Sequence, residues 1–321
     1  MKHLPKTALG FLVFLTPLAS GRTLLAEPPA GAAQEDASAA AQTEVEKIQE
    51  TDAGRFLRIK RDAAGEPVAL ETAIVRYVPA AGEGDLAVDL IGCVHVAQRS
   101  YYGRLNKRFD DYDVVLYELV APKGTRIRGD DDRRSLNPLS MLQGMTESML
   151  ELESQTAYIN YTRENFVHAD MSPDDMAQAM RERGDDGLTI FLSATADALR
   201  EQNLRELERE RNPKPQPEAT SPDPLALLFD ANRAVKLKRM LAEQFEALGT
   251  NSLGDTLNIL LIEDRNKAAM RVFQTELAKG RKRIAIFYGA GHMADFEKRL
   301  LSDVGLRRDR VEWMAAWNLK L

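Results

Sequence analysis

Residues 88–95 read Val-Asp-Leu-Ile-Gly-Cys-Val-His, and residues 284–292 read Ile-Ala-Ile-Phe-Tyr-Gly-Ala-Gly-His. In each stretch an apolar run leads into Gly-x-x-His. Apolar runs of this length closed by glycine are typical of buried strands that end in a tight turn. We therefore expect His95 and His292 to lie just past the C-terminal ends of two strands, where open α/β sheets bind ligands. Gly92, Gly289 and Gly291 give the backbone room to turn and leave space for a ligand.

The remaining pattern places strands at both ends of the chain and helices between them. Strands are expected over 68–78, 86–91, 114–117, 166–170, 283–288 and 311–317, and a helix over 100–109. This order predicts an α+β (α/β-like) fold, in which a mixed central sheet is built from the N- and C-terminal strands. A large helical insert covers about 136–280 and contains a Pro-rich loop at 212–224. Joining the terminal strands in one sheet would bring His95 and His292 together.

The first 26 residues have the features of an export signal. Lys2 and Lys6 precede a short apolar run from Ala8 to Leu18, and small residues suited to cleavage follow. We predict a signal peptide at 1–26, a disordered linker at 27–53 that is rich in Ala, Glu, Gln and Pro, and one domain at 54–321. The protein is then exported, and is periplasmic or secreted. An uncleaved signal would instead anchor it close to a membrane.

Composition narrows the classes of partner. The 321 residues are 44% hydrophobic and 29% charged, which is an ordinary globular composition. A net charge of −6 with no basic stripe excludes a nucleic-acid surface, so we expect a peptide or small-molecule substrate. The single cysteine, Cys93, excludes an intramolecular disulfide and a Cys-rich zinc site.

His95, Glu118 and His292 form the candidate site. Glu118 ends the strand at 114–117, and if this strand is the parallel neighbour of the strand before His95, both residues share one edge of the sheet. Two imidazoles and a carboxylate suit a divalent metal with open positions, such as zinc, manganese or cobalt. The same groups could also work without metal, with a histidine as general base toward water.

Four further residues are candidates for a supporting role. His168 and Asp170 form a His-x-Asp step in a short strand, so their side chains point the same way, either toward the site or at an exposed strand end. Arg265 and Asn266 lie in a helix expected over 255–279. Charge on such a helix is usually a solvated face, although arginine can also clamp a carboxylate.

These motifs resemble the TraB/PrgY/GumN superfamily, which includes the TIKI proteins. The resemblance rests on Gly92-Cys-Val-His95, Tyr117-Glu-Leu119, Arg265-Asn266 and Gly289-Ala-Gly-His292, and it spans about residues 70–320. It implies a fold like that of TIKI proteins and erythromycin esterases, with His95, Glu118 and His292 as site residues. TIKI members are metal-dependent proteases, PrgY-like members restrain peptide pheromones, and the esterases use a histidine and a glutamate. Cys93 departs from the Thr or Ser that is more familiar at that position.

Three functions follow as hypotheses. The first is an exported metal-dependent hydrolase, possibly peptidase-like, in which His95, Glu118 and His292 bind the ion and the ion activates water. The second is a protein that binds and sequesters a peptide or small ligand without turnover. The third is a metal-independent esterase, whose activity would be indifferent to a chelator.

Overall fold

The computed structural model describes residues 56–82, 84–121, 125, 148–184, 230–248 and 258–321. The predicted signal peptide, the linker and the Pro-rich loop at 212–224 lie outside these residues, as does much of the predicted insert at 136–280. Among the helices that are described, none is long and apolar enough to cross a membrane.

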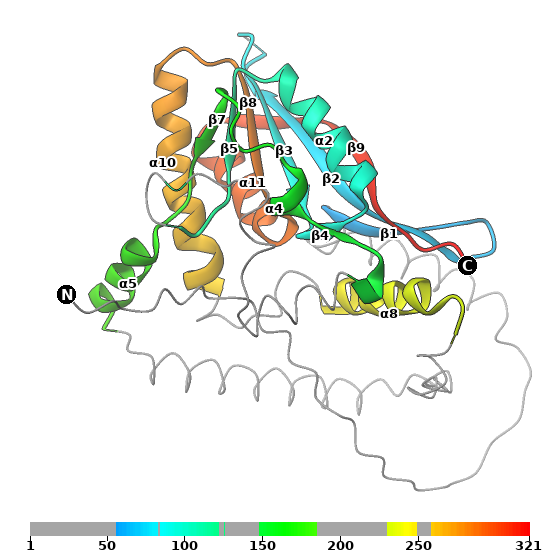
Figure 1. Ribbon diagram of the computed structural model, residues 1–321. Coiled ribbons are helices and arrows are strands. Elements are labelled where there is room, and N and C mark those ends of the chain that lie inside the picture. The colour runs from blue at the N-terminus through cyan, green and yellow to red at the C-terminus, as the bar shows by residue number, and fades with distance from the viewer. Residues whose placement is uncertain (1–55, 83, 122–124, 126–147, 185–229, 249–257) are drawn as a thin grey trace, which may run out of the picture.

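A seven-stranded mixed sheet organises the fold (Figure 1). Its order is β1–β2–β3–β8–β5–β7, and β9 pairs with β2. Strands β3, β8, β5 and β7 run parallel, whereas β2 pairs antiparallel with β1, β3 and β9. The predicted α+β architecture, with a mixed sheet built from both ends of the chain, is confirmed. The strands are β1 (Leu57–Arg61), β2 (Pro67–Pro79), β3 (Ala87–Cys93), β5 (Val114–Tyr117), β7 (Phe166–His168), β8 (Arg283–Gly289) and β9 (Leu306–Asn318).

One condition of the predicted topology is not met. The strands before His95 and Glu118 are not neighbours, because β8 lies between β3 and β5 and pairs with both. The insert at 136–280 contains the strand expected over 166–170, which is observed as β7. Its β7 adds to the edge of the main sheet beside β5, and its β6 (Glu153–Ser154) pairs with β4 (Val96–Ala97) in a separate two-stranded sheet.

Helices cover both faces of the parallel half (Figure 1). Successive strand residues point to opposite faces, so each strand divides its apolar side chains between two cores. Ile91, Val115 and Phe287 share one core with α2 (Arg99–Arg108). Leu90, Leu116 and Ile286 share the other core with α10 (Asp264–Ala278) and α11 (Met293–Ser302). The shorter helix α4 (Gln155–Tyr158) and the helices α5 (Pro173–Glu182) and α8 (Arg233–Leu248) complete the described elements of the insert.

Helix boundaries follow local chemistry in α5 and depart from it before α10. Ser172 begins α5 with a capping box, in which its side chain and that of Asp175 each bond the other residue's backbone N–H. The helix expected over 255–279 is not uniform, because residues Ile259–Glu263 form a π-helical turn before α10. Such turns frequently occur at functional sites, and this one ends two residues before Arg265.

Candidate functional site

The C-terminal ends of the four parallel strands lie side by side. Cys93 at the end of β3 pairs with Gly289 at the end of β8, and Tyr117 at the end of β5 pairs with both Phe287 and His168. The segments that follow these strands carry His95, Glu118 and His292, whereas Arg265 and Asn266 reach the same edge from α10. The expectation that His95 and Glu118 share one sheet edge is therefore confirmed, although an intervening strand separates their own strands.

Gly289 is the point at which the three central residues meet. A methyl group on its Cα would lie 3.3 Å from Glu118 Oε2, 3.7 Å from His95 Nε2 and 3.9 Å from the His292 ring at Cδ2. Because glycine has no side chain, two imidazoles and a carboxylate can approach the backbone closely at this position. The structure thus brings together residues that are nearly two hundred positions apart in sequence.

The Glu118 carboxylate is ionised and is fixed in position by hydrogen bonds to both of its oxygens. Its Oε1 accepts from Arg265 Nη2 at 2.5 Å, and its Oε2 accepts from the Gly289 backbone N–H at 2.7 Å. His292 Nε2 lies 3.5 Å from Oε1. Burial by itself would raise the pKa of Glu118, but the opposing effects of His292, Arg265 and His95 hold that pKa well below its ordinary value. Glu118 therefore keeps its charge and does not act as a proton donor near neutral pH.

Arg265 is the buried cation that balances this charge. Its side chain is 5% exposed and forms a fork with Asp170, Nε to Oδ1 at 3.0 Å and Nη2 to Oδ2 at 2.7 Å. The same Nη2 reaches Glu118, and Nη1 lies 3.3 Å from the Leu261 carbonyl oxygen and 3.4 Å from His292 Nε2. Burial lowers the pKa of Arg265, but Glu118 and Asp170 more than offset this and raise it, so the guanidinium stays charged. Of the two alternatives that the sequence left open for Arg265, the clamp is the one observed.

His168 and Asp170 both contact the backbone of Leu119, the residue after Glu118. The Leu119 backbone N–H donates to Asp170 Oδ2 at 2.9 Å, and His168 Nε2 lies 2.6 Å from the Leu119 carbonyl oxygen. The two side chains thus point the same way, as the His-x-Asp spacing predicts. The Asp170 side chain is fully buried, whereas His168 is half-buried, so both support the site and neither marks an exposed strand end.

Asn266 fixes the proton of His292. Its Nδ2 donates to the His292 carbonyl oxygen at 3.0 Å and to Asp295 Oδ2 at 2.9 Å, which leaves its Oδ1 facing His292 Nδ1 at 2.7 Å. Asp295 is held in turn by Arg299. Because Oδ1 can only accept, we assign a proton to Nδ1, while Nε2 lies 3.4 Å from Arg265 Nη1 and 3.5 Å from Glu118 Oε1.

His95 differs from His292 in being exposed. Its ring makes no hydrogen bond with the described residues, but its carbonyl oxygen accepts from the Gln155 backbone N–H at 2.8 Å. The Gln155 side chain accepts from the Cys93 thiol at 3.2 Å and donates to the Tyr161 hydroxyl at 2.8 Å. Burial, with the nearby Glu118 charge, raises the pKa of the Cys93 thiol well above its ordinary value, so Cys93 is a neutral packing residue.

The three glycines have three different roles. A side chain at Gly92 would meet Met293 at 3.4 Å and the Ala73 carbonyl oxygen at 3.5 Å, so this glycine permits close packing of the α11 start against β3 and does not make room for a ligand. Only Gly289 opens space inside the site. Gly291 faces nothing within 4 Å, so an added methyl group there would meet open space.

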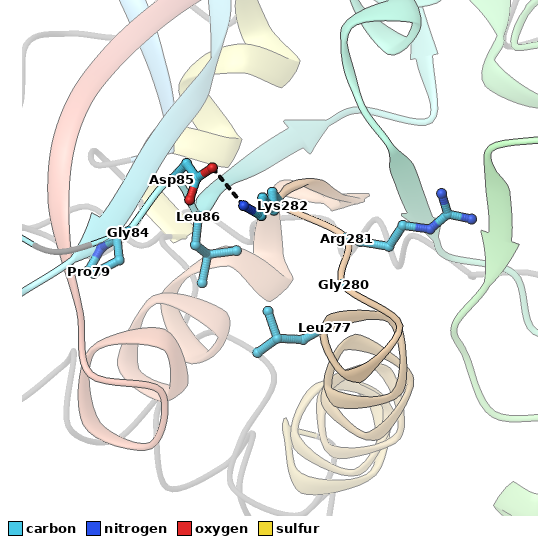
Figure 2. Close-up of a pocket in the computed structure, with 8 residues that line it drawn as sticks. All are labelled: Pro79, Gly84, Asp85, Leu86, Leu277, Gly280, Arg281 and Lys282. Carbon is cyan, nitrogen blue, oxygen red and sulfur yellow. Dashed lines mark hydrogen bonds and ion pairs between the residues drawn. The ribbon is translucent and has the colours of Figure 1, made fainter.

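A separate cavity lies at the opposite edge of the sheet, where β3 and β8 begin. It has a volume of about 250 Å³, and Figure 2 shows Leu86 and Leu277 beside an ion pair between Lys282 Nζ and Asp85 Oδ2, which are 2.7 Å apart. Both members of that pair are exposed, and none of the predicted site residues lines the cavity. Its lining residues are Pro79, Gly84, Asp85, Leu86, Leu277, Gly280, Arg281 and Lys282.

The donor set does not fit a divalent metal in this arrangement. Within the described ranges, no three His, Cys, Asp or Glu side chains are grouped so as to hold an ion. The physical reason lies in Arg265, whose Nη1 and Nη2 point at His292 Nε2 and at Glu118 Oε1. Those are the atoms that a metal shared by His292 and Glu118 would need, and a guanidinium next to them repels a second cation.

The chain matches no protein-family model, no curated protein and no solved structure.

Several contributors were not predicted from the sequence. Gln155 and Tyr161 carry no recognisable motif, and their role depends on how the insert folds back onto β3. Asp295 has a weak local signal, because it lies three residues after His292 and four before Arg299 and so shares a helix face with both.

Proposed function

We propose that this protein is a hydrolase that cleaves an ester or amide carbonyl at the Gly289 point, with His95 as general base. A single observation carries the proposal: His95 Nε2, Glu118 Oε2 and the His292 ring all lie within 4 Å of the position that a Cβ atom on Gly289 would take, so the three groups converge beside this glycine. A general base acts at about 2.6–3.2 Å or through one water molecule, so His95 would act on a carbonyl bound beside Gly289 through a water molecule.

The residues divide the work by exposure. His95 is the exposed imidazole, so its Nε2 is free to meet water and substrate. Glu118 is ionised and close by, and therefore stabilises the imidazolium that forms when His95 takes a proton. His292 is 5% exposed and is bonded on both ring nitrogens, so it serves to hold Arg265 and Glu118 in place.

The reaction balances with these groups alone. The lone pair of His95 Nε2 takes a proton from water while the water oxygen forms a bond to the carbonyl carbon. The tetrahedral intermediate then collapses, and the leaving oxygen or nitrogen takes the proton back from His95 as its bond to carbon breaks, which releases a neutral alcohol or amine and the carboxylic acid. Glu118 stays ionised throughout, and Arg265 keeps it so.

The test is hydrolysis by the purified 27–321 chain of short p-nitrophenyl esters and of a quenched fluorogenic peptide pool. We expect turnover that His95→Ala and Glu118→Gln abolish. Gly289→Ala should lower kcat/KM by about tenfold or more, because the methyl group would lie 3.3 Å from Glu118 Oε2 and displace the site residues, whereas Gly291→Ala should leave kcat/KM unchanged and so controls for the loss of a glycine from the same turn. Wild-type turnover that survives both His95→Ala and Glu118→Gln would refute the proposal.

Chelator separates this proposal from the metal-dependent hydrolase that the family resemblance implies. The metal-free reaction is indifferent to EDTA, whereas a reaction through zinc, manganese or cobalt is lost and then restored by the ion. Saturable binding of a peptide that is recovered unchanged would instead indicate a sequestering protein. We also propose membership of the TraB/PrgY/GumN superfamily and a TIKI-like fold, which rest on the motifs. Export and a signal peptide are proposed from residues 1–26.

A further inference from the structure

We infer that Arg265 is the resident cation of this site and takes the place of a divalent metal, so that removal of its side chain converts the site into a metal-binding one. The inference deepens the proposed function, because it identifies the positive charge on which Glu118 depends. Its test measures metal binding and needs no substrate.

All five N–H donors of the Arg265 guanidinium have partners in the site. Arginine has five N–H donors in a rigid fork. Here Nε and one Nη2 donor reach Asp170, the second Nη2 donor reaches Glu118, and the two Nη1 donors face the Leu261 carbonyl oxygen and His292 Nε2. A side chain that merely passed through the site would leave some of these donors unpaired.

Arg265 also balances the negative charge of the site. Arg265 is the cation bonded to two buried carboxylates, those of Glu118 and Asp170, whose side chains are 11% and 0% exposed. Without it, two negative charges would face each other beside the rings of His292 and His95. Buried charges of this kind are tolerated only when they are paired or coordinate a metal.

The atoms that Arg265 contacts would be suitable metal ligands once its side chain is removed. Loss of the guanidinium exposes Glu118 Oε1, Asp170 Oδ2 and His292 Nε2, each of which Arg265 contacts at 2.5–3.4 Å. His95 Nε2 faces the same space from the solvent side. Carboxylate oxygens and neutral imidazoles are ligands that zinc and cobalt accept.

The experiment compares wild type with Arg265→Ala by equilibrium dialysis against Zn²⁺ and Co²⁺ at neutral pH, followed by the visible absorption of bound Co²⁺. We expect Arg265→Ala to bind about one equivalent, at least tenfold more tightly than wild type. Arg265→Ala combined with Glu118→Gln is the matched control and should lose that binding. Added guanidinium chloride at non-denaturing concentration should compete with the metal in Arg265→Ala.

Folding is followed by circular dichroism, because Arg265→Ala leaves two buried carboxylates unpaired. If it does not fold, Arg265→Met combined with Asp170→Asn replaces it, since that variant removes one charge of each sign and keeps Glu118, His95 and His292. One equivalent bound by wild type and lost in Glu118→Gln would overturn the inference, as would folded variants lacking Arg265 that bind no metal. Neither result bears on whether the site hydrolyses a substrate, which the ester and peptide assays decide separately.

Discussion

His292 and His95 end two turns of the same Gly-x-x-His pattern, yet their surroundings differ. His292 is 5% exposed, with Asn266 on one ring nitrogen and Arg265 on the other. His95 is exposed, and its ring has no hydrogen bond with the described residues. A buried ring held on both sides is a structural support, whereas a free ring beside an ionised carboxylate can take and return a proton. The comparison teaches that a repeated motif can place one histidine for rigidity and the other for chemistry.

The largest effect is expected at the carboxylate that both rings share. Glu118→Gln removes the charge that stabilises a His95 imidazolium, and it presents an amide to Arg265. Loss of the carboxylate partner from a catalytic histidine lowers kcat by about 10³- to 10⁴-fold. Steady-state kinetics on the best ester or peptide would check this. A loss below about tenfold would show that Glu118 is not the partner of the catalytic imidazole.

Truncation of the two histidines should have different effects on activity and on stability. His95→Ala should lower kcat by about 10²- to 10⁴-fold with little change in Tm, because its exposed ring stabilises the fold little. His292→Ala should lower activity too, but should also lower Tm by several degrees, because it removes a buried ring and leaves Asn266 Oδ1 and one Arg265 Nη1 donor without their His292 partner. Thermal unfolding of both variants decides this, and equal Tm losses would contradict the division of roles.

The sequence predicted which residues form the site, but not the strand order or the role of Arg265, and both omissions have physical causes. Strand periodicity and the glycine turns located His95, Glu118 and His292, because these signals are local. The position of β8 between β3 and β5 was not predicted, since strand order is set by contacts between distant segments. Arg265 was ambiguous because a charged residue on a helix is usually solvated, and only the buried partners Glu118 and Asp170 identify it as a clamp.

Acid should weaken the site in a defined direction. The pKa of Glu118 is lower in the folded protein than the value of about 4.3 in an unfolded chain. The folded state therefore binds this proton less readily, and the stability that Glu118 contributes is complete above that unfolded value and falls as the pH drops through the folded one. We expect the Tm of wild type to fall more steeply than that of Glu118→Gln below about pH 4. Parallel Tm curves for the two proteins would contradict this.

The smallest effect is expected at Asp295, which acts through Asn266. Asp295→Asn lets both amides rotate, so that Asn266 can also present its NH₂ group to His292 and admit the Nε2–H tautomer. We expect kcat to fall only severalfold, by an amount on the order of 1 kcal/mol for one altered hydrogen bond. The ¹⁵N shifts of the His292 ring should show a mixed tautomer in the variant and the Nδ1–H form in wild type. An unchanged ring spectrum would show that Asp295 does not set the orientation of Asn266.

The most direct test of the central claim is a ring-resonance spectrum, because the chain has only four histidines and substitution assigns each of them. Both imidazoles meet at Gly289, so Gly289→Ala should shift the ring signals of His95 and His292 together, and Gly291→Ala should leave the His95 signals in place. A His95 ring that is unaffected by Gly289→Ala would contradict the account, since it would place that histidine away from the point that the two turns are proposed to share.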